Sequence, residues 1–274
     1  MNRRAKVFAF GAALVALISA VLVNVSTGTS SAGPDCTKTL VIGAHGIDEG
    51  GAADFGGFGE KAVAVLGSFN RAYGQGAVDA VPLDFPLVKH QDLYAPGRIS
   101  VLFASVNAGI SILVNLLVER AIACPTQPIV LVGYSEGAWI VHQALFRIGS
   151  QISGRIVGIG LLADPVRIGT DSYNIGTASH DFNGIGVLYT GDPRPVPSAL
   201  QGRTLSWCDD GDPVCAFDTR AKNPVPVLVH GFTTHTQYVS KGEAQQLGTR
   251  LGNLARGFLP APGCETTSPV HGGC

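Results

Sequence analysis

The chain has 274 residues, of which 46% are hydrophobic and 14% are charged, and its formal net charge is −1. This length suits one large domain or two small ones, and the composition supplies enough apolar residues for a substantial core. A net charge so close to zero does not support a nucleic-acid-binding protein, which needs a basic surface. The sequence contains no P-loop, no H-E-x-x-H motif and no Cys-x-x-Cys spacing, so we expect no cofactor and no bound metal.

The first 32 residues have the pattern of an export signal. Two arginines and a lysine within residues 2–6 precede an apolar segment, residues 7–25, and small side chains at residues 30–32 suit a cleavage site. The apolar segment is close to the length of a bilayer span, so an uncleaved membrane anchor is the alternative. We expect a secreted or envelope-associated protein whose folded domain covers residues 34–259.

Apolar strand patterns alternate with helical patterns through this domain. The expected strands are residues 39–44, 78–85, 129–134, 154–162 and 203–207, and the expected helices are residues 60–73, 98–123, 136–149 and 241–258. The alternation predicts an α/β fold with a central, mostly parallel five-stranded sheet and helices on both faces.

Four segments of this pattern carry further expectations. Residues 78–85 contain a proline and are followed by another, which favours an edge strand. Residues 98–123 are apolar on most faces, so we expect this helix to be largely buried. Residues 165–202 are rich in Gly, Pro, Ser and Asn and are expected to form a long loop, and residues 260–274 a short polar tail.

All six cysteines lie beyond the expected signal. They are Cys36, Cys124, Cys208, Cys215, Cys264 and Cys274. An even number of cysteines in an exported chain favours disulfides, with buried free thiols as the alternative. Six cysteines allow 15 pairings. Close spacing favours Cys208–Cys215 and Cys264–Cys274, which leaves Cys36 for Cys124.

Residues 133–137, with the sequence Gly-Tyr-Ser-Glu-Gly, are the most informative motif. An expected strand leads into them and an expected helix leads out, which is the setting of a G-x-S-x-G nucleophile elbow. Such a tight turn tolerates little side chain beside the serine, and it exposes the hydroxyl at the top of the strand. Ser135 is therefore the candidate nucleophile, and the N–H of Glu136 is a candidate oxyanion donor. An ordinary Gly-rich turn is the alternative.

A serine nucleophile needs a base and an acid that orients the base, and in α/β-hydrolases these follow in the order Ser, acid, His. Asp212 is the candidate acid, because a disulfide between Cys208 and Cys215 would hold its carboxylate in a small ring. Asp164, at the end of an expected strand, is the runner-up. A calcium site formed by Asp212 with its neighbours Asp209 and Asp210 is a further alternative.

Two histidines are candidate bases. His235 lies just ahead of the last expected helix, and His230 follows an apolar run at residues 225–229. We favour His235, although the sequence alone does not decide between them. His142, on the helix after the elbow, is expected to be a packing residue. The second oxyanion donor is expected to be the N–H of Ile47, because loops after the first strand supply it in this fold.

Four segments together resemble the cutinase family of secreted serine esterases, in its actinobacterial branch. They are residues 133–137, Asp164–Arg167, Cys208–Cys215 and His235–Tyr238, and the resemblance covers roughly residues 36–258. It implies a small α/β-hydrolase with a largely uncovered active site and with Ser135, Asp212 and His235 as nucleophile, acid and base. It also implies disulfides Cys36–Cys124 and Cys208–Cys215.

The chain departs from the family pattern in three places. Glu136 replaces the usual Gln, and a carboxylate near a developing oxyanion is unfavourable unless it points away or is paired. The segment His45-Gly46-Ile47 replaces Arg-Gly-Ser or Arg-Gly-Thr, so a supplementary hydroxyl donor is absent, and losing such a donor can cost about 100-fold in rate. The 22 residues between Asp212 and His235 exceed the family spacing, which strengthens His230 as a competitor.

These residues predict a secreted carboxylic-ester hydrolase of cutinase or lipase type that acts on lipid-like or polymeric esters through an acyl-enzyme. We expect a monomer whose partners are a lipid or ester substrate and, as a further option, the cell envelope, but not nucleic acid. Two alternatives share the scaffold. One is acyl transfer to an envelope acceptor, and the other is a catalytically weak envelope-binding protein.

Overall fold

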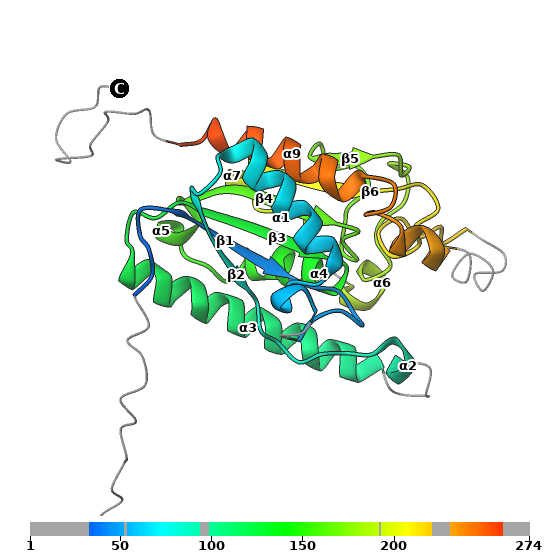
Figure 1. Cartoon of the computed structure of the whole chain (residues 1–274). Coiled ribbons are helices and arrows are strands. Elements are labelled where there is room, and N and C mark those ends of the chain that lie inside the picture. Colours follow the sequence, from blue (N-terminus) through cyan, green and yellow to red (C-terminus); the bar gives the residue numbers. More distant parts are fainter. Residues whose placement is uncertain (1–32, 52–53, 94–98, 192, 221–230, 260–274) are drawn as a thin grey trace, which may run out of the picture. The chain divides into compact units, whose positions relative to one another are not determined.

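The computed structural model of the chain describes residues 33–51, 54–93, 99–191, 193–220 and 231–259. Its centre is one sheet of six strands in the order β2-β1-β3-β4-β6-β5 (Figure 1). The strands are β1 (Thr39–Ala44), β2 (Val78–Pro82), β3 (Ile129–Tyr134), β4 (Ile156–Leu162), β5 (Asn174–Gly176) and β6 (Thr204–Cys208). Every neighbouring pair is parallel. The α/β prediction is confirmed.

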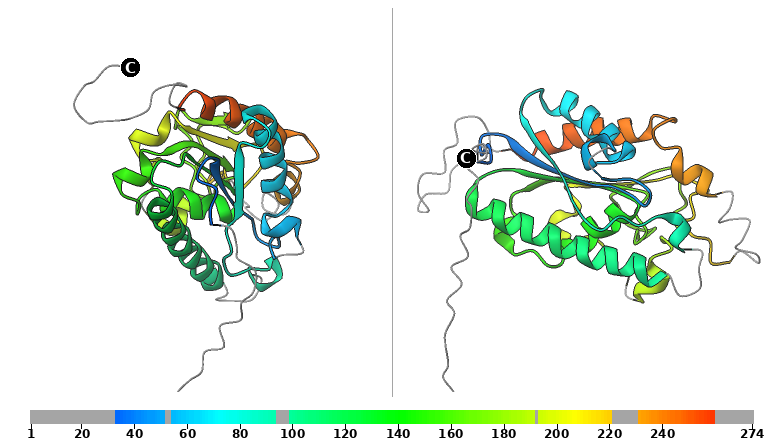
Figure 2. Two further views of the ribbon diagram at one scale, coloured as in Figure 1. Left: turned by 60° about the vertical axis from the view of Figure 1, so that its left-hand side comes forward. Right: turned by 60° about the horizontal axis from the view of Figure 1, so that its bottom comes forward.

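Helices cover both faces of the sheet. They are the 3-10 helix η1 (Phe55–Gly57) and the helices α1 (Glu60–Tyr73), α2 (His90–Leu93), α3 (Ile99–Ala123), α4 (Glu136–Ala144), α5 (Ser150–Ser153), α6 (Val187–Thr190), α7 (Ser198–Gln201) and α9 (Glu243–Arg256). Residues 231–236 are also helical. Helices α1 and α9 lie side by side on one face, and α3 and α4 cover the other (Figures 1 and 2).

The sequence of β1 shows why both faces are covered. Leu40 and Ile42 are fully buried in the core formed with α3 and α4, whereas Val41, between them, is fully buried in the core formed with α1 and α9. Successive side chains of a strand point to opposite faces of the sheet. A continuous apolar strand is therefore expected where two helical layers enclose a parallel sheet.

The number of strands differs from the prediction by one. The additional strand, β5, lies within residues 165–202, which also contain the short helices α6 and α7 instead of one continuous loop. β5 pairs with β6 at the edge of the sheet, and β2 forms the opposite edge as expected. The helix after the elbow is shorter than the predicted residues 136–149, because the backbone continues past α4 with i→i−3 hydrogen bonds at Phe146 and Arg147.

Helix α3 is less buried than predicted. Leu113 and Leu117 are fully buried in the core, but Val118 is 42% exposed and Ile122 is 77% exposed. By length and hydropathy α3 could span a membrane. Its inner face instead packs into the core with α4. Because α3 is apolar on all sides, its sequence did not show that neighbouring elements cover only one of its faces.

The central strands β1 and β3 place the candidate site. They are neighbours, and the chain leaves β1 toward β2 on one side but leaves β3 toward β4 on the other. In open parallel sheets, binding sites form outside the carboxyl ends of the strands at such a reversal of strand order. The loop after β1 and the elbow after β3 therefore meet at one edge of the sheet.

Two disulfides join described residues. Cys36 pairs with Cys124, and Cys208 pairs with Cys215. These are the pairings that the family resemblance implied. The expected pair Cys264–Cys274 and the expected signal at residues 1–32 lie outside the described residues, as does the tail at 260–274.

Candidate active site

Ser135 occupies a sharp turn between β3 and α4. Its backbone has φ 53° and ψ −117°, a positive-φ conformation that is rare for a residue with a side chain. The N–H of Ser135 donates to the carbonyl of Leu162 at 2.9 Å, and its carbonyl accepts from the N–H of Trp139 at 3.0 Å. These anchors hold a conformation that is unfavourable on its own, as is common at functional sites.

The two glycines of the motif are required by contacts with other backbone atoms. A Cβ on Gly133 would lie 2.6 Å from the backbone N of Ala138. A Cβ on Gly137 would lie 2.3 Å from the carbonyl oxygen of Ala44 and 2.5 Å from that of His45. The elbow thus lets α4 approach both its own strand and the loop after β1.

His235 lies against Ser135, although 100 residues separate them. Nε2 of His235 is 2.9 Å from Oγ of Ser135, and Nδ1 is 2.9 Å from Oδ2 and 3.1 Å from Oδ1 of Asp212. A carboxylate only accepts hydrogen bonds, so Nδ1–H of the imidazole donates to Asp212 and Nε2 accepts from the hydroxyl of Ser135. This tautomer is the one in which a histidine can remove a proton from serine.

Asp212 is fully buried, and all of its described partners are hydrogen-bond donors. Besides His235, Oδ1 accepts from the N–H of Val214 at 2.9 Å and Oδ2 accepts from the hydroxyl of Tyr238 at 2.6 Å. A buried carboxylate is costly unless its lone pairs are satisfied. These four bonds stabilise its charge and fix its direction toward the imidazole.

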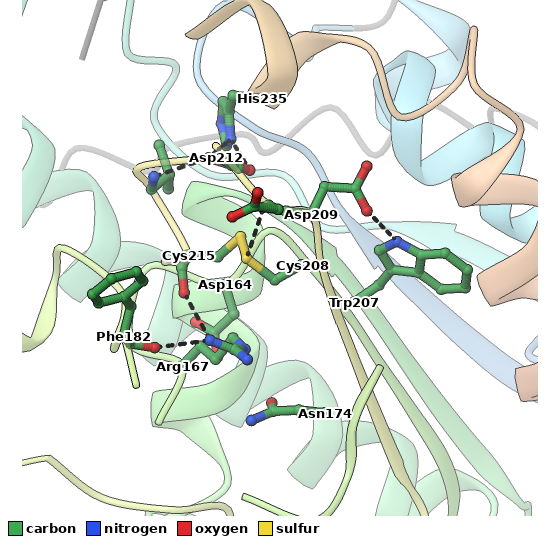
Figure 3. Close-up of a disulfide and its surroundings, with 12 residues drawn as sticks. Asp164, Arg167, Asn174, Phe182, Trp207, Cys208, Asp209, Asp212, Cys215 and His235 are labelled. Atoms are coloured by element: carbon green, nitrogen blue, oxygen red, sulfur yellow. Dashed lines mark hydrogen bonds and ion pairs between the residues drawn. A yellow bond between two sulfur atoms is a disulfide. The ribbon is translucent and has the colours of Figure 1, made fainter. Parts of the chain in front are cut away.

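A disulfide and a buried arginine hold the loop that carries Asp212 (Figure 3). Cys208 and Cys215 close a short ring around the aspartate. The guanidinium of Arg167, only 1% exposed, donates to the carbonyls of Phe182 at 2.9 Å and Cys215 at 3.4 Å. Arg167 therefore connects the loop after β4 to the end of the ring.

Asp164, the runner-up acid, is paired with a different histidine, His142. Its Oδ2 lies 2.6 Å from Nδ1 of His142, and its Oδ1 accepts from the N–H of Val166 at 3.0 Å. His142 is fully buried, as expected of a packing residue, but it also forms this ion pair and contacts the carbonyl of Arg194 through Nε2 at 3.0 Å. Asp164 thus belongs to a separate pair that joins α4 to the loop after β4.

The three aspartates of the disulfide ring have separate surroundings. Asp209 accepts from the indole N–H of Trp207 at 3.0 Å and lies 3.4 Å from Nζ of Lys241, Asp210 is exposed, and Asp212 faces His235. Among the described residues no group of three potential ligands is arranged to hold a metal ion. The competing base, His230, lies outside the described residues.

The loop after β1 runs directly against Ser135. A Cβ on Gly46 would lie 3.3 Å from Cβ of Ser135. The carbonyl of Gly46 accepts two hydrogen bonds, from Nδ1–H of His45 at 2.9 Å and from the N–H of Glu49 at 3.2 Å. In a trans peptide the C=O and N–H point in opposite directions, so these bonds also fix the direction of the Ile47 N–H.

Two tyrosines that we assigned no role support His235 and Asp212. The hydroxyl of Tyr134 donates to the carbonyl of His235 at 2.8 Å, and the two rings stack with centroids 5.2 Å apart. Tyr238 supports Asp212 from the other side. Both tyrosines lie in the segments that carried the family resemblance, but nothing in the linear sequence shows where their hydroxyls point.

Glu136, the first residue of α4, departs most clearly from expectation. It is 1% exposed, and neither carboxylate oxygen has a hydrogen-bond partner among the residues that the structure describes. Burial raises its pKa from 4.5 to about 7, and the nearby hydroxyl of Ser105 opposes this shift. The side chain is therefore buried, and the pairing that would make a carboxylate harmless here is absent among the described residues.

Comparison with known proteins gives the family of the chain. A sequence model of the cutinase family matches residues 35–248. The chain belongs to the cutinase family. This membership agrees with the α/β-hydrolase fold described above.

Individual cutinases and esterases are distant relatives of this chain. It is 24% identical over 153 residues to cutinase CUT1 of Coprinopsis cinerea, covering 55% of this chain but only 64% of that protein. It is 24% identical over 243 residues to carboxylesterase Culp1 of Mycobacterium tuberculosis, covering 88% of this chain and 92% of that protein. The solved structure of a cutinase-like protein from Cryptococcus sp. superposes with a TM-score of 0.62 at 22% identity, covering 84% and 98% of the two chains, which supports the shared fold.

Proposed function

We propose that this protein is a secreted serine esterase that hydrolyses lipid-like or polymeric esters through an acyl-enzyme. The observation that carries the proposal is the hydrogen-bonded series Ser135, His235 and Asp212, with distances of 2.9 Å at both links. The order along the chain, serine, acid and histidine, is that of α/β-hydrolases.

In this proposal, Oγ of Ser135 attacks the ester carbonyl while Nε2 of His235 accepts its proton. Asp212 stabilises the imidazolium that forms and keeps the ring in the required tautomer. The N–H groups of Glu136 and Ile47 stabilise the oxyanion of the tetrahedral intermediate. His235 then protonates the leaving alcohol, which departs and leaves the acyl group on Ser135. In the second half of the reaction water attacks the acyl-enzyme, His235 accepts a proton from this water, and it returns a proton to Oγ of Ser135 as the acid is released.

Exposed apolar side chains beside the base and on α6 support an apolar acyl group. Phe232 is 50% exposed, and its ring centroid lies 6.3 Å from that of His235. On α6, Leu188 and Tyr189 are 57% and 55% exposed, and the ring of Tyr189 contacts Phe103 of α3 at 5.6 Å. Apolar side chains beside the base suit the hydrocarbon portion of a lipid-like ester better than they suit a charged substrate.

Export is supported by the cysteine chemistry together with the expected signal at residues 1–32. Both disulfides join described residues, and disulfides persist in oxidising compartments outside the cytosol.

A fluorophosphonate probe and a panel of p-nitrophenyl esters test the proposal. We expect the probe to label Ser135 in the folded protein, and we expect ester turnover that depends on acyl length and is abolished in Ser135→Ala. Absence of both labelling and turnover, with lipid binding that persists in Ser135→Ala, would instead support a catalytically weak envelope-binding protein. Product analysis with an added acceptor alcohol separates hydrolysis from acyl transfer.

A further inference from the structure

Glu136 is a buried acid directly beside the nucleophile, and it has no described hydrogen-bond partner. The nearby polar side chain is that of Ser105 on α3, but its hydroxyl donates to the carbonyl of Pro86 at 2.6 Å. A buried ionised carboxylate without partners is strongly disfavoured, whereas a neutral carboxylic acid carries no charge to desolvate. The geometry alone therefore favours the protonated form.

The elements packed against α4 offer no counter-charge. These elements are α3, β1, β3 and β4. β1 and β4 carry no ionisable side chain, and β3 carries only Tyr134, whose hydroxyl is bonded to the backbone of His235. The charged residues of α3, Glu119 and Arg120, lie in its last two turns, far along the helix from Ser105.

Nearby ionisable groups outside these elements have other partners or lie at the surface. On α4 itself, His142 is paired with Asp164. In the loop after β1, Glu49 lies 2.9 Å from Nζ of Lys61, and burial lowers the pKa of His45, which favours its neutral form.

The loop that contains Pro86 carries two further charges. Asp84 is exposed and Lys89 is half-buried. Burial remains the largest influence on Glu136 and raises its pKa to about 7.

We propose that Glu136 serves the esterase reaction as a neutral carboxylic acid and that its ionisation suppresses catalysis. This inference rests on the proposed function, because it concerns the same nucleophile and oxyanion donor. The backbone N–H of Glu136 is the proposed donor to the oxyanion, so its own side chain is attached one residue from the reacting centre. A negative charge there would repel the negative charge that develops in the transition state, in a poorly solvated environment where charges interact strongly.

The proposal predicts a bell-shaped dependence of kcat/KM on pH. On the acid side, activity falls because His235 must be neutral to accept the proton of Ser135. On the alkaline side, activity falls tenfold or more between about pH 7 and about pH 9 as Glu136 ionises. An esterase limited only by its histidine would reach a plateau instead.

The decisive variant is Glu136→Gln, which has nearly the same shape and cannot ionise. We expect its kcat/KM near pH 9 to equal or exceed its value near pH 7, so that the alkaline fall disappears. Glu119→Gln, an exposed substitution on α3, is the matched control and should keep the parent profile. Ser135→Ala supplies the background rate of ester hydrolysis at each pH.

Infrared difference spectra give a reading independent of activity. The parent should show a protonated carboxyl signal near neutral pH that is lost by about pH 9 and is absent in Glu136→Gln.

The outcomes separate this inference from the proposed function. If the parent hydrolyses esters but shows an alkaline plateau, or if folded Glu136→Gln falls as the parent does, the inference is wrong and the esterase proposal stands. If the parent is neither labelled by the fluorophosphonate nor active at any pH, the proposed function itself fails. Loss of the carboxyl signal already below about pH 5 would also overturn the inference, because Glu136 would then have an ordinary pKa.

Discussion

The hydroxyl of Tyr238 lies 2.6 Å from Oδ2 of Asp212 and donates a hydrogen bond to it. Tyr238 is fully buried, and burial together with the adjacent Asp212 raises the pKa of its hydroxyl well above 10. The tyrosine therefore remains a donor throughout the pH range in which the protein would act. It holds Asp212 on the side opposite to its N–H donor from Val214 and leaves the carboxylate directed at His235.

We expect Tyr238→Phe to lower kcat roughly 10- to 100-fold with little change in KM, because a hydrogen bond to a charged group contributes about 1.5–3 kcal/mol. The loss acts through Asp212 on the base and does not involve substrate binding. Tyr73→Phe is the matched control. That hydroxyl bonds Oγ1 of Thr39 at 2.6 Å, at the start of β1 and thus at the other end of the sheet. Steady-state kinetics on both variants check the prediction, and an equal fall in kcat for the two would contradict it.

The sequence was most informative where local pattern and chemistry coincide. Strand, tight turn and helix around Ser135 are adjacent in the chain, so the elbow could be predicted, and the fold order then limited the acid and base to a few later residues. The structure brings Asp212 and His235 to Ser135. The local pattern did not indicate that Asp164 would pair with His142, because that contact depends on how α4 packs against the loop after β4.

Other features depend on tertiary packing and so could not be predicted from the sequence. β5 has only three residues, Asn174–Gly176, and lacks the apolar alternation that marks a longer strand. The exposed side of α3 was hidden by its uniformly apolar composition. A carboxylate at position 136 could be raised as a question from the sequence, but its burial and its lack of a partner among the described residues required coordinates.

Substitution of the two buried aspartates distinguishes their roles. We expect Asp212→Asn to lower kcat by about 10⁴-fold while the protein stays folded, because the amide would favour the wrong tautomer of His235. We expect Asp164→Asn to lower stability, since it leaves His142 without its buried carboxylate partner, but to retain most of the activity of the molecules that remain folded.

Two measurements make the comparison of Asp212→Asn with Asp164→Asn quantitative. Thermal unfolding measures stability, and titration with a fluorophosphonate counts the reactive serines. The rate per labelled serine corrects for any unfolded fraction of Asp164→Asn. A larger loss of that corrected rate in Asp164→Asn than in Asp212→Asn would reverse the assignment of the acid.

The two disulfides should have different effects when they are removed. Cys36–Cys124 closes a loop with a sequence separation of 88, so the chain-entropy description gives it roughly 4.6 kcal/mol of stability, against roughly 2.5 kcal/mol for Cys208–Cys215 with a separation of 7. The shorter ring carries Asp212, however, and its loss should loosen the contact with His235.

We therefore expect the double substitution Cys36→Ala and Cys124→Ala to lower the unfolding temperature more, with kcat per folded molecule unchanged. Cys208→Ala with Cys215→Ala should lower the temperature less but reduce kcat. Calorimetry and kinetics on the two double variants check this, and each serves as the control for the other. An unchanged kcat after removal of the shorter ring would show that Tyr238 and Arg167 suffice to position Asp212.

The pair of His142 and Asp164 should make the stability of the protein depend on pH. Burial alone would lower the pKa of His142, but the charge and hydrogen bond of Asp164 outweigh burial and raise it above 6.5. The folded protein then holds this proton more tightly than the unfolded chain does. Its stabilising contribution is complete below about pH 6.5 and is lost as the pH rises through the folded-state pKa.

We expect His142→Gln to destabilise the protein by roughly 3 kcal/mol near pH 6, because it leaves Asp164 buried without its cationic partner. The difference in unfolding temperature between the parent and this variant should narrow toward about pH 9 as the parent loses the same charge. Contributions from other groups, including Glu136, are common to both proteins and cancel in the difference. A difference that stays constant from about pH 6 to about pH 9 would mean that His142 is neutral in the folded protein and that its pKa is not raised.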